Sequence, residues 1–311
     1  MEILKKVPEE LSYMRLDKAC SIIFEDFSRT QHKKWIIQGR ILLNNELASP
    51  RDIVCQYDEI QINPVSEKKT SWIAEDIDFE IIKEKKDYLI INKPSNLIMH
   101  PGAGCDVGTL ANGLIYRFPE LKNIPRVGIV HRLDKDTSGI VLVARTERFR
   151  NYFVNLLQER KVKKNYKAIV VGNILGSFEI IDPIGRDKNN RIKMSIRPDG
   201  KEAHTFVKLE ENYQNYSLLD ISIKTGRTHQ IRVHLSSKRL PIIGDNTYNP
   251  SKNIAKGTPA SLKNIIRDFP RQALHSHQLS FEDPDSNEML TFKAPIHEDM
   301  ENLIKILKKH I

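Results

Sequence analysis

The chain has 311 residues, and its 49 Lys and Arg outnumber its 40 Asp and Glu, which gives a net charge of +9 and a pI near 9.3. The length suits two domains, and the basic charge favours a polyanionic partner, although it also suits solubility or acidic lipids. No apolar run approaches the about 20 residues of a membrane helix, and residues 1–16 lack the basic start and apolar core of a signal peptide. We therefore expect a soluble protein.

The three cysteines point to a reducing compartment. Cys20, Cys55 and Cys105 are odd in number, far apart and without the spacing of metal ligands. This favours reduced thiols in a cytoplasm over disulfides or zinc.

Residues 1–70 are predicted to form a small accessory domain. Apolar residues at helical spacing between Leu16 and Phe27 predict one helix, and Ser28 followed by Gln31 is typical of a capping box that opens a second. Gly39 ends that helix, and residues 41–43 and 60–62 predict short strands around an Asn-Asn turn.

Positive charge gathers on and just after the second predicted helix. The basic residues there are Arg29, His32, Lys33, Lys34 and Arg40. Their charge is equally compatible with contact to a phosphate backbone and with a solvated helix face.

The polar, charged segment 64–75 interrupts the pattern, and we place a linker at residues 71–78 and a second domain at 79–311.

This second domain begins with a predicted hairpin, residues 79–82 and 88–91. Helical stripes follow near residues 110–118 and 149–157, then strands at 166–171, 203–209 and 216–224. Residues 185–201 are basic and rich in turns, and a helix closes the chain. Many antiparallel strands with helices between them predict an α+β fold, with a mixed, mainly antiparallel sheet and flanking helices.

A polar turn between two apolar runs is the strongest candidate for a reactive loop. Gly128–Val130 and Ile140–Ala144 predict buried strands, and Asp134 lies between them. Arg132 and Lys135 are close in sequence and would favour an ionised carboxylate, which suits a nucleophile or cation stabiliser. The alternative is that Asp134 or Asp136 binds its own backbone in the turn.

Two further segments carry candidate site residues. In Thr225-Gly-Arg-Thr-His-Gln-Ile-Arg-Val-His234, Gly226 permits a tight turn, Thr228 is a candidate cap, and the histidines lack the Glu of a helical zinc motif. His100 precedes a Gly-rich turn, where a lone histidine can touch substrate or simply hold structure.

Long motifs now support a family comparison. His131-Arg-Leu-Asp-Lys-Asp-Thr-Ser-Gly139 and the segment 225–234 resemble the RluA-type family of RNA pseudouridine synthases. Segments 100–104, 164–168 and 271–275 are most similar to members that modify large-subunit ribosomal RNA. Residues 15–17, 28–29 and 39–44 resemble the S4 RNA-binding module, although Asn45 and Tyr57 depart from its usual glycines.

The resemblance implies roles for individual residues. Asp134 would be the catalytic carboxylate, Arg232 would pair with it, and Tyr166 would stack on the target base. Such stacking restores about 1–3 kcal/mol to a flipped base. The substrate-binding residues would be Arg132, Arg227, His131 and Lys164. The RNA contacts of the S4-like module would be Arg29, Lys33, Lys34 and Arg40.

The resemblance also implies the reaction and its partners. We expect an isomerase that needs no cofactor and no metal, acts as a monomer away from membranes, and modifies the helix 69 stem-loop of large-subunit ribosomal RNA, free or in an assembling subunit. Two other functions compete. A non-catalytic ribosomal RNA-binding or ribosome-assembly protein would explain the charge, but not the combination of Asp134, Tyr166 and Arg232. A metal-dependent nuclease would need a cluster of ligands that the spacing does not provide.

Overall fold

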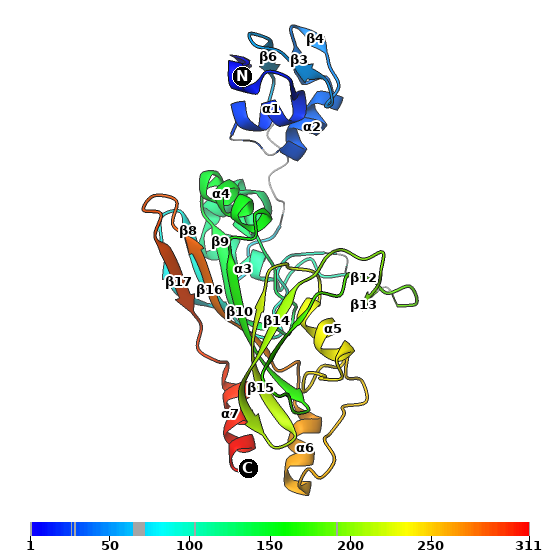
Figure 1. Cartoon of the computed structure of the whole chain (residues 1–311). Coiled ribbons are helices and arrows are strands. Elements are labelled where there is room, and N and C mark those ends of the chain that lie inside the picture. The colour runs from blue at the N-terminus through cyan, green and yellow to red at the C-terminus, as the bar shows by residue number, and fades with distance from the viewer. Residues whose placement is uncertain are drawn as a thin grey trace. The chain divides into compact units, whose positions relative to one another are not determined.

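The computed structural model describes residues 2–25, 27, 29–64, 72–102, 104–190 and 192–310. The chain divides into two compact units, residues 1–71 and 72–311 (Figure 1). Residues 65–71, which include the first residue of the predicted linker 71–78, lie outside the described residues. From Trp72 onward the chain belongs to the second unit, where the Ile73 carbonyl accepts a hydrogen bond of 2.7 Å from the Asn112 side chain.

The N-terminal unit packs two helices, α1 (Leu16–Ile23) and α2 (Arg29–Ile37), with a four-stranded sheet of order β1-β6-β3-β4. These strands span Ile3–Lys6, Glu59–Ile62, Ile41–Leu43 and Glu46–Leu47, and β2 (Met14–Arg15) pairs with β5 (Ile53–Val54). Asn44 and Asn45 both have positive φ, as the tight turn of a β-hairpin requires. The predicted helices and strands are present, while Ser28 of the predicted capping box lies outside the described residues.

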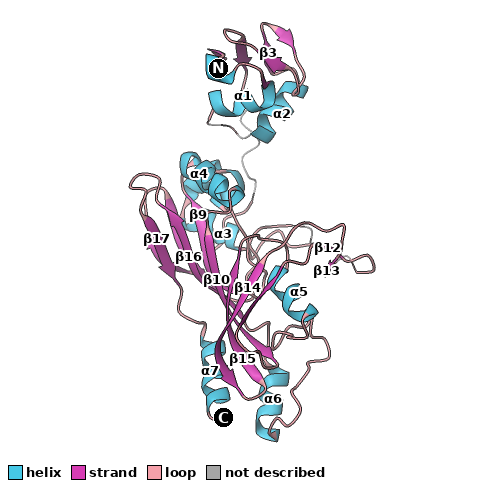
Figure 2. Cartoon of the chain, viewed as in Figure 1, coloured by secondary structure: helices cyan, strands magenta, loops and turns pink. Residues whose placement is uncertain are grey.

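The second unit is built on a nine-stranded sheet of order β11-β14-β15-β10-β16-β9-β8-β7, with β17 beside β16 (Figure 2). Only β16 and β9 run parallel among the paired strands of the described chain. In chain order these strands are β7 Glu80–Glu84, β8 Tyr88–Lys93, β9 Ser138–Ala144, β10 Lys163–Val171, β11 Ser177–Ile180, β14 Thr205–Tyr213, β15 Tyr216–Ile223, β16 Leu274–Glu282 and β17 Met289–Lys293. The α+β prediction is confirmed.

Helices cover both faces of this sheet. They are α3 Leu110–Arg117, α4 Glu147–Gln158, α5 Gln230–Ser237, α6 Ala260–Asp268 and α7 Glu298–Lys308. Strand β9 is apolar from Ile140 to Ala144 because it is buried on both faces. Val141 and Val143 join the core that includes α3, while Ile140 and Leu142 join the core that includes α4. A strand buried on both faces cannot alternate apolar and polar residues.

The structure corrects three local predictions. Residues 128–130 are not a strand: η3 (Pro125–Gly128) is followed by a single bridge from Ile129 to Val143. A side chain at Gly128 would collide with the Ala144 carbonyl, so the chain turns tightly against β9 there. Segment 185–201, for which turns but no strands were predicted, carries a small hairpin, β12 (Ile184–Arg186) with β13 (Met194–Ile196).

The third correction concerns the start of α5. Thr228 does not cap it; His229 occupies the cap position with φ 55° and makes no side-chain cap bond. The Gln230 side chain instead accepts a hydrogen bond of 3.0 Å from the Arg227 backbone N–H.

Candidate active site

The loop that carries Asp134 is held by buried polar groups from other segments. Lys93 is fully buried and donates to the Lys135 carbonyl at 2.9 Å, as well as to those of Pro94 and Leu97. Arg271 donates to the Asp136 carbonyl at 3.1 Å, and its guanidinium also binds both carboxylate oxygens of Asp299. The loop backbone is therefore fixed before any substrate arrives.

Burial is the main influence on the Lys93 ammonium and lowers its pKa to about 7. The negative charge of Asp136 opposes this shift, Arg271 adds to it, and Asp134 opposes it. Because the group touches three carbonyl oxygens, its removal would leave buried acceptors without a donor.

Arg232 of α5 joins two carboxylates that are distant in sequence. Its Nη1 donates to Asp134 Oδ2 at 2.9 Å, and its Nε and Nη2 bind Asp245 at 2.8 and 2.9 Å. Arg232 therefore forms a bidentate ion pair with Asp245, which fixes the direction of the guanidinium. Asp134 accepts a single hydrogen bond from the same guanidinium. Burial alone would lower the pKa of Arg232, but the bonds and charges of Asp245 and Asp134 outweigh it and raise that pKa.

Sequence reasoning missed Asp245. It is 1 % exposed, and its Oδ1 also accepts from the backbone N–H groups of Thr247 and Tyr248. It lies between α5 and α6, and no local sequence pattern there marks a carboxylate that reaches α5.

The positive charge beside Asp134 also differs in origin from the prediction. Among the described residues, neither Arg132 nor Lys135 forms an ion pair with Asp134, and the guanidinium at bonding distance is that of Arg232. His229 Nε2 lies 3.8 Å from the other carboxylate oxygen. Burial lowers the pKa of His229, against the opposing charge of Asp134. The alternative that Asp134 serves its own turn is not needed, because its carboxylate accepts from Arg232.

Tyr166 of β10 lies beside this pair. It is 7 % exposed and follows a shift in register between β10 and β16. Burial raises the pKa of its hydroxyl to about 12, a hydrogen bond with Ser276 acts against the rise, and the charge of Asp134 adds to it. Tyr166 lines a hollow of about 90 Å³ together with Asp134 and Arg232.

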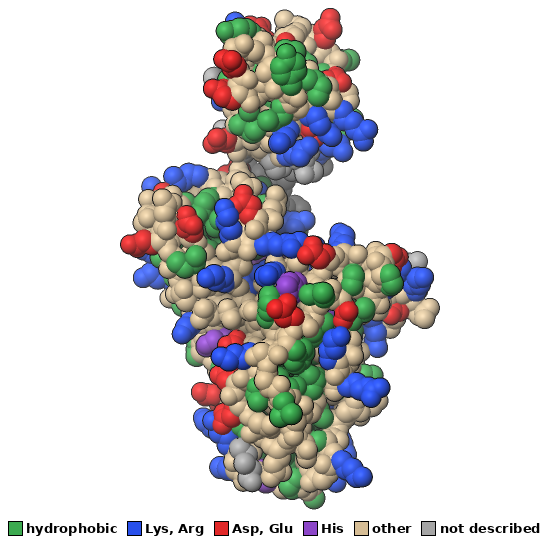
Figure 3. Space-filling model, viewed as in Figure 1, with side chains coloured by type: hydrophobic (Ala, Val, Ile, Leu, Met, Phe, Trp, Pro, Cys, Tyr) green, Lys and Arg blue, Asp and Glu red, His purple; other side chains and the backbone are tan. Residues whose placement is uncertain are grey.

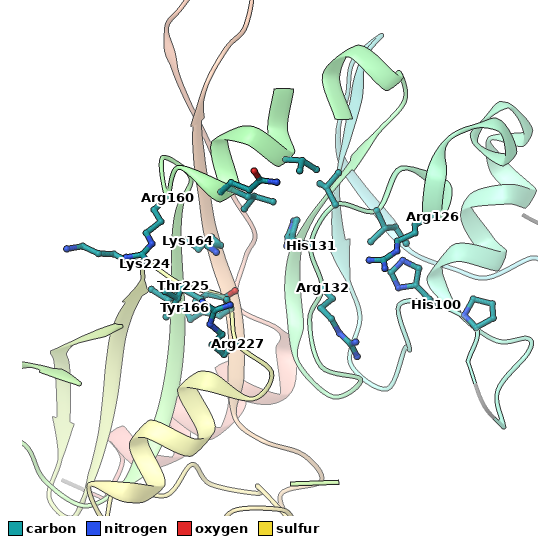
Figure 4. Close-up of a pocket in the computed structure, with 18 of the residues that line it drawn as sticks. His100, Arg126, His131, Arg132, Arg160, Lys164, Tyr166, Lys224, Thr225 and Arg227 are labelled. Carbon is teal, nitrogen blue, oxygen red and sulfur yellow. The ribbon is translucent and has the colours of Figure 1, made fainter. Parts of the chain in front are cut away.

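The same tyrosine also lines a cleft of about 800 Å³, so the small hollow and the cleft meet at its ring. Figure 4 shows two walls: Arg160, Lys164, Lys224 and Arg227 lie on the side of Tyr166, and His100, Arg126, His131 and Arg132 face them. None of the described side chains that line the cleft is a carboxylate. A cleft with one sign of charge concentrates ligands of the opposite sign.

The predicted substrate-binding residues lie on these walls, and they differ in exposure, in pKa and in hydrogen bonding. Arg132 is exposed and, within the described chain, has no ion-pair partner. Burial lowers the pKa of the Lys164 ammonium to about 8, and Arg227 Nε donates to the Glu202 carbonyl at 2.9 Å. His131 Nε2 accepts a hydrogen bond of 2.9 Å from Leu142 N–H, and burial lowers its pKa to about 3, so the neutral ring ties the loop to β9.

The basic residues predicted for the N-terminal unit separate into two groups. Figure 3 shows Lys and Arg side chains gathered on the side where α2 lies, and Lys33, Lys34 and Arg40 are exposed. Arg29 instead donates to the buried Asp17 at 2.9 Å. His32 is fully buried beside Phe24, Phe27 and Trp35, so it was wrongly included in the basic surface.

Comparisons with known proteins agree with both units. Residues 87–237 match the family model described as RNA pseudouridylate synthase, and residues 14–60 match the S4 domain. The chain is 39% identical over 296 residues to the ribosomal large subunit pseudouridine synthase D of Vibrio parahaemolyticus, covering 95% of this chain and 91% of that protein. The chain belongs to the RluA-type family of RNA pseudouridine synthases. The enzyme isomerises uridine to pseudouridine in RNA, as the resemblance implied.

Other relatives extend this finding. The pseudouridine synthase D of Escherichia coli K12 is 36% identical over 309 residues, which cover 99% of this chain and 95% of that one. The solved structure of human RNA pseudouridylate synthase domain containing 1 matches with a TM-score of 0.53 at 25% identity, over 74% of this chain and 95% of that one. Human RNA pseudouridylate synthase domain containing 4 matches in fold with a TM-score of 0.59 at 24% identity, over 73% and 92% of the two chains.

The described residues contain neither a membrane-spanning helix nor a cluster of metal ligands. None of the described helices has both the length and the apolar composition of a transmembrane segment. No group of three or more His, Cys, Asp or Glu side chains in that part of the chain has the arrangement of a metal site.

Proposed function

We propose that this pseudouridine synthase acts in the cytoplasm on 23S ribosomal RNA, at uridines of the helix 69 stem-loop, with Asp134 as its catalytic carboxylate. In this proposal residues 1–70 bind RNA and residues 79–311 carry the reaction. The names of the near full-length relatives support the ribosomal substrate. The observation that carries the assignment of Asp134 is its bond to a doubly anchored arginine, next to Tyr166, where the basic cleft begins.

The reaction exchanges one bond of the nucleotide for another. The bond from uracil N1 to ribose C1′ breaks, the base turns, and C5 bonds to C1′; the proton on C5 leaves and N1 gains one, so no atoms or electrons are lost. Two sugar-centred routes start from an ionised carboxylate. Asp134 either meets C1′ as the base departs, as carboxylates do in glycoside chemistry, or removes a ribose proton to give a glycal.

The surroundings of Asp134 fit a base that has left its helix. The Tyr166 ring provides an aromatic face, which suits a flipped uracil because the base loses its stacking neighbours. Arg132 is exposed at the same cleft, where it would fill the vacated stack or hold a phosphate. The cationic walls would hold the backbone of the RNA.

Pseudouridine mapping tests this proposal. Ribosomal RNA is compared from cells with the gene, without it, and with the gene restored as wild type, Asp134→Asn or Asp285→Asn. Asp285 is an exposed carboxylate, and its substitution is the matched control. We expect pseudouridine in the helix 69 loop only with the wild type and the control.

Three outcomes would contradict the proposal. Pseudouridine that depends on the gene only at other RNA positions would exclude the proposed target, and modification that persists with Asp134→Asn would exclude the role of Asp134. Purified protein that binds the RNA without converting it would favour the non-catalytic alternative.

A further inference from the structure

The large cleft extends beyond the group of residues that surround the reacting base. Trp72, His100, Pro101 and Arg126 line the cleft of about 800 Å³ but not the hollow that holds Asp134. Tyr166 and Arg132 line both. The part of the cleft around Trp72 is therefore continuous with the hollow that holds Asp134, but the proposed reaction gives its residues no role.

One ring nitrogen of His100 lacks a hydrogen-bond partner in this part of the cleft. Its Nε2 is buried and has no hydrogen-bond partner in the described part of the chain. Burial, with added repulsion from Arg126 and Arg132, lowers the pKa of the imidazole to about 4, so the ring is neutral at pH 7. The Trp72 ring lies 5.6 Å from it, centre to centre, at 60°. A buried polar atom without a partner is rare in folded proteins and calls for an explanation.

Arg126 is held beside His100 by an unusual backbone. Its φ is 55° and that of the following Val127 is 57°, in the left-handed region that branched residues rarely adopt. Val127 is fully buried, which anchors the turn, while Arg126 is exposed and forms no ion pair with any described residue. Such strain is concentrated at ligand-binding segments, where the surrounding structure maintains it.

We propose that Trp72, His100 and Arg126 bind a nucleotide that neighbours the target uridine in the same RNA strand. The inference rests on the proposed function and adds a second nucleotide site to it. The base lies against the Trp72 and His100 rings, which offer an aromatic face and a neutral imidazole. The phosphate lies on the Arg126 guanidinium. This combination of aromatic ring, neutral polar group and unpaired cation matches the parts of a nucleotide.

Position in the cleft favours RNA over a free nucleotide. Arg126 and Arg132 lie on the same wall in Figure 4, so one backbone that passes Arg132 continues towards Arg126. A free nucleotide would not need a cleft that also opens onto Tyr166. The site would select the uridine by what stands next to it.

The test combines enzyme variants with altered substrates. The probe is a helix 69 stem-loop transcript, intact or with an abasic residue at one position beside the target, and pseudouridine formation gives kcat and KM. We expect an abasic residue at one neighbouring position to lower the wild-type kcat/KM about 10-fold. His100→Ala should lose a similar factor on the intact transcript and little more on the abasic one, because both changes remove the same contact.

Arg126→Asn provides a second variant that does not depend on a buried substitution. Asn tolerates the left-handed backbone, so the protein should keep or raise its Tm while KM for the intact transcript rises about 10-fold and kcat stays the same. Arg239→Asn is the matched control: Arg239 is exposed, has φ 60°, and lies outside the cleft. It should leave KM unchanged.

The outcomes separate this inference from the proposed function. If the wild type forms no pseudouridine in the intact transcript, both are overturned. If it does, but the losses from His100→Ala and from every abasic position multiply, or Arg126→Asn behaves like Arg239→Asn, the second nucleotide site alone is overturned.

Discussion

The loop of Asp134 and the walls of the cleft differ in the burial and the pairing of their cationic side chains. Around the loop, Lys93, Arg232 and Arg271 are buried, and each is bound to carbonyl or carboxylate oxygens. On one wall of the cleft, Arg126 and Arg132 are exposed and without ion-pair partners among the described residues, whereas Arg160 on the opposite wall pairs with Glu202 at 2.6 Å. The difference implies that the groups we propose to react are fixed before RNA binds, whereas recognition would depend on exposed cations that the RNA itself neutralises. Variants of the loop should therefore change kcat, and variants of the walls should change KM.

Apart from changes to Asp134 itself, Asp245→Asn should give the largest effect on rate. It removes the charge that holds Nε and Nη2 of Arg232, so the guanidinium loses its fixed direction towards Asp134. We expect kcat to fall about 100-fold with little change in KM, because a small misplacement near the reacting atoms has such an effect. Steady-state kinetics check this against Asp285→Asn, and a kcat within a factor of about two of the wild type would show that Asp134 does not depend on this anchor.

Lys93→Met should mainly affect stability. The substitution leaves three carbonyl oxygens without their buried donor. We expect the free energy of unfolding to fall by about 3 kcal/mol, with a smaller loss of kcat as the loop loosens. Denaturant unfolding measures it beside Lys83→Met, which alters an exposed lysine of β7. Equal stability of the two variants would mean that the loop is held by other contacts.

The next largest effect should be on the pH dependence of KM, which reflects RNA binding. The Lys164 ammonium has a pKa of about 8, so it is charged below that pH and loses its charge above it. We expect KM to rise several-fold between pH 7 and pH 9 in the wild type, and to stay level in Lys164→Arg, whose guanidinium remains charged. Initial rates across this range provide the measurement. A wild-type profile that matches that of Lys164→Arg would exclude Lys164 as a phosphate contact.

A salt titration should show the smallest effect. Arg132→Gln removes one unpaired cation, so the slope of log KM against log salt should decrease by about one, with kcat unchanged if Arg132 holds a phosphate. A fall in kcat with an unchanged slope would assign Arg132 to the vacated stack instead.

Sequence patterns predicted the elements whose formation depends on residues that are close together in the chain. The spacing of apolar residues gave most helices and strands, and the motifs around Asp134 and Arg232 identified two side chains that the fold brings within 2.9 Å. Asp245, Lys93 and Arg271 were not predicted as site residues, because their roles depend on contacts between segments far apart in the sequence. Residues 128–130 were predicted as a strand because they are apolar, but the left-handed Arg126 and Val127 turn the chain first.

A single-turnover experiment tests the central claim most directly. Excess Asp134→Asn enzyme is mixed with a helix 69 transcript, and pseudouridine formation and RNA affinity are measured together beside the wild type and Asp285→Asn. We predict that Asp134→Asn binds the RNA with nearly wild-type affinity and forms pseudouridine at least about 1,000-fold more slowly. Conversion at the wild-type rate by Asp134→Asn would contradict the account, because the chemistry would then belong to another group.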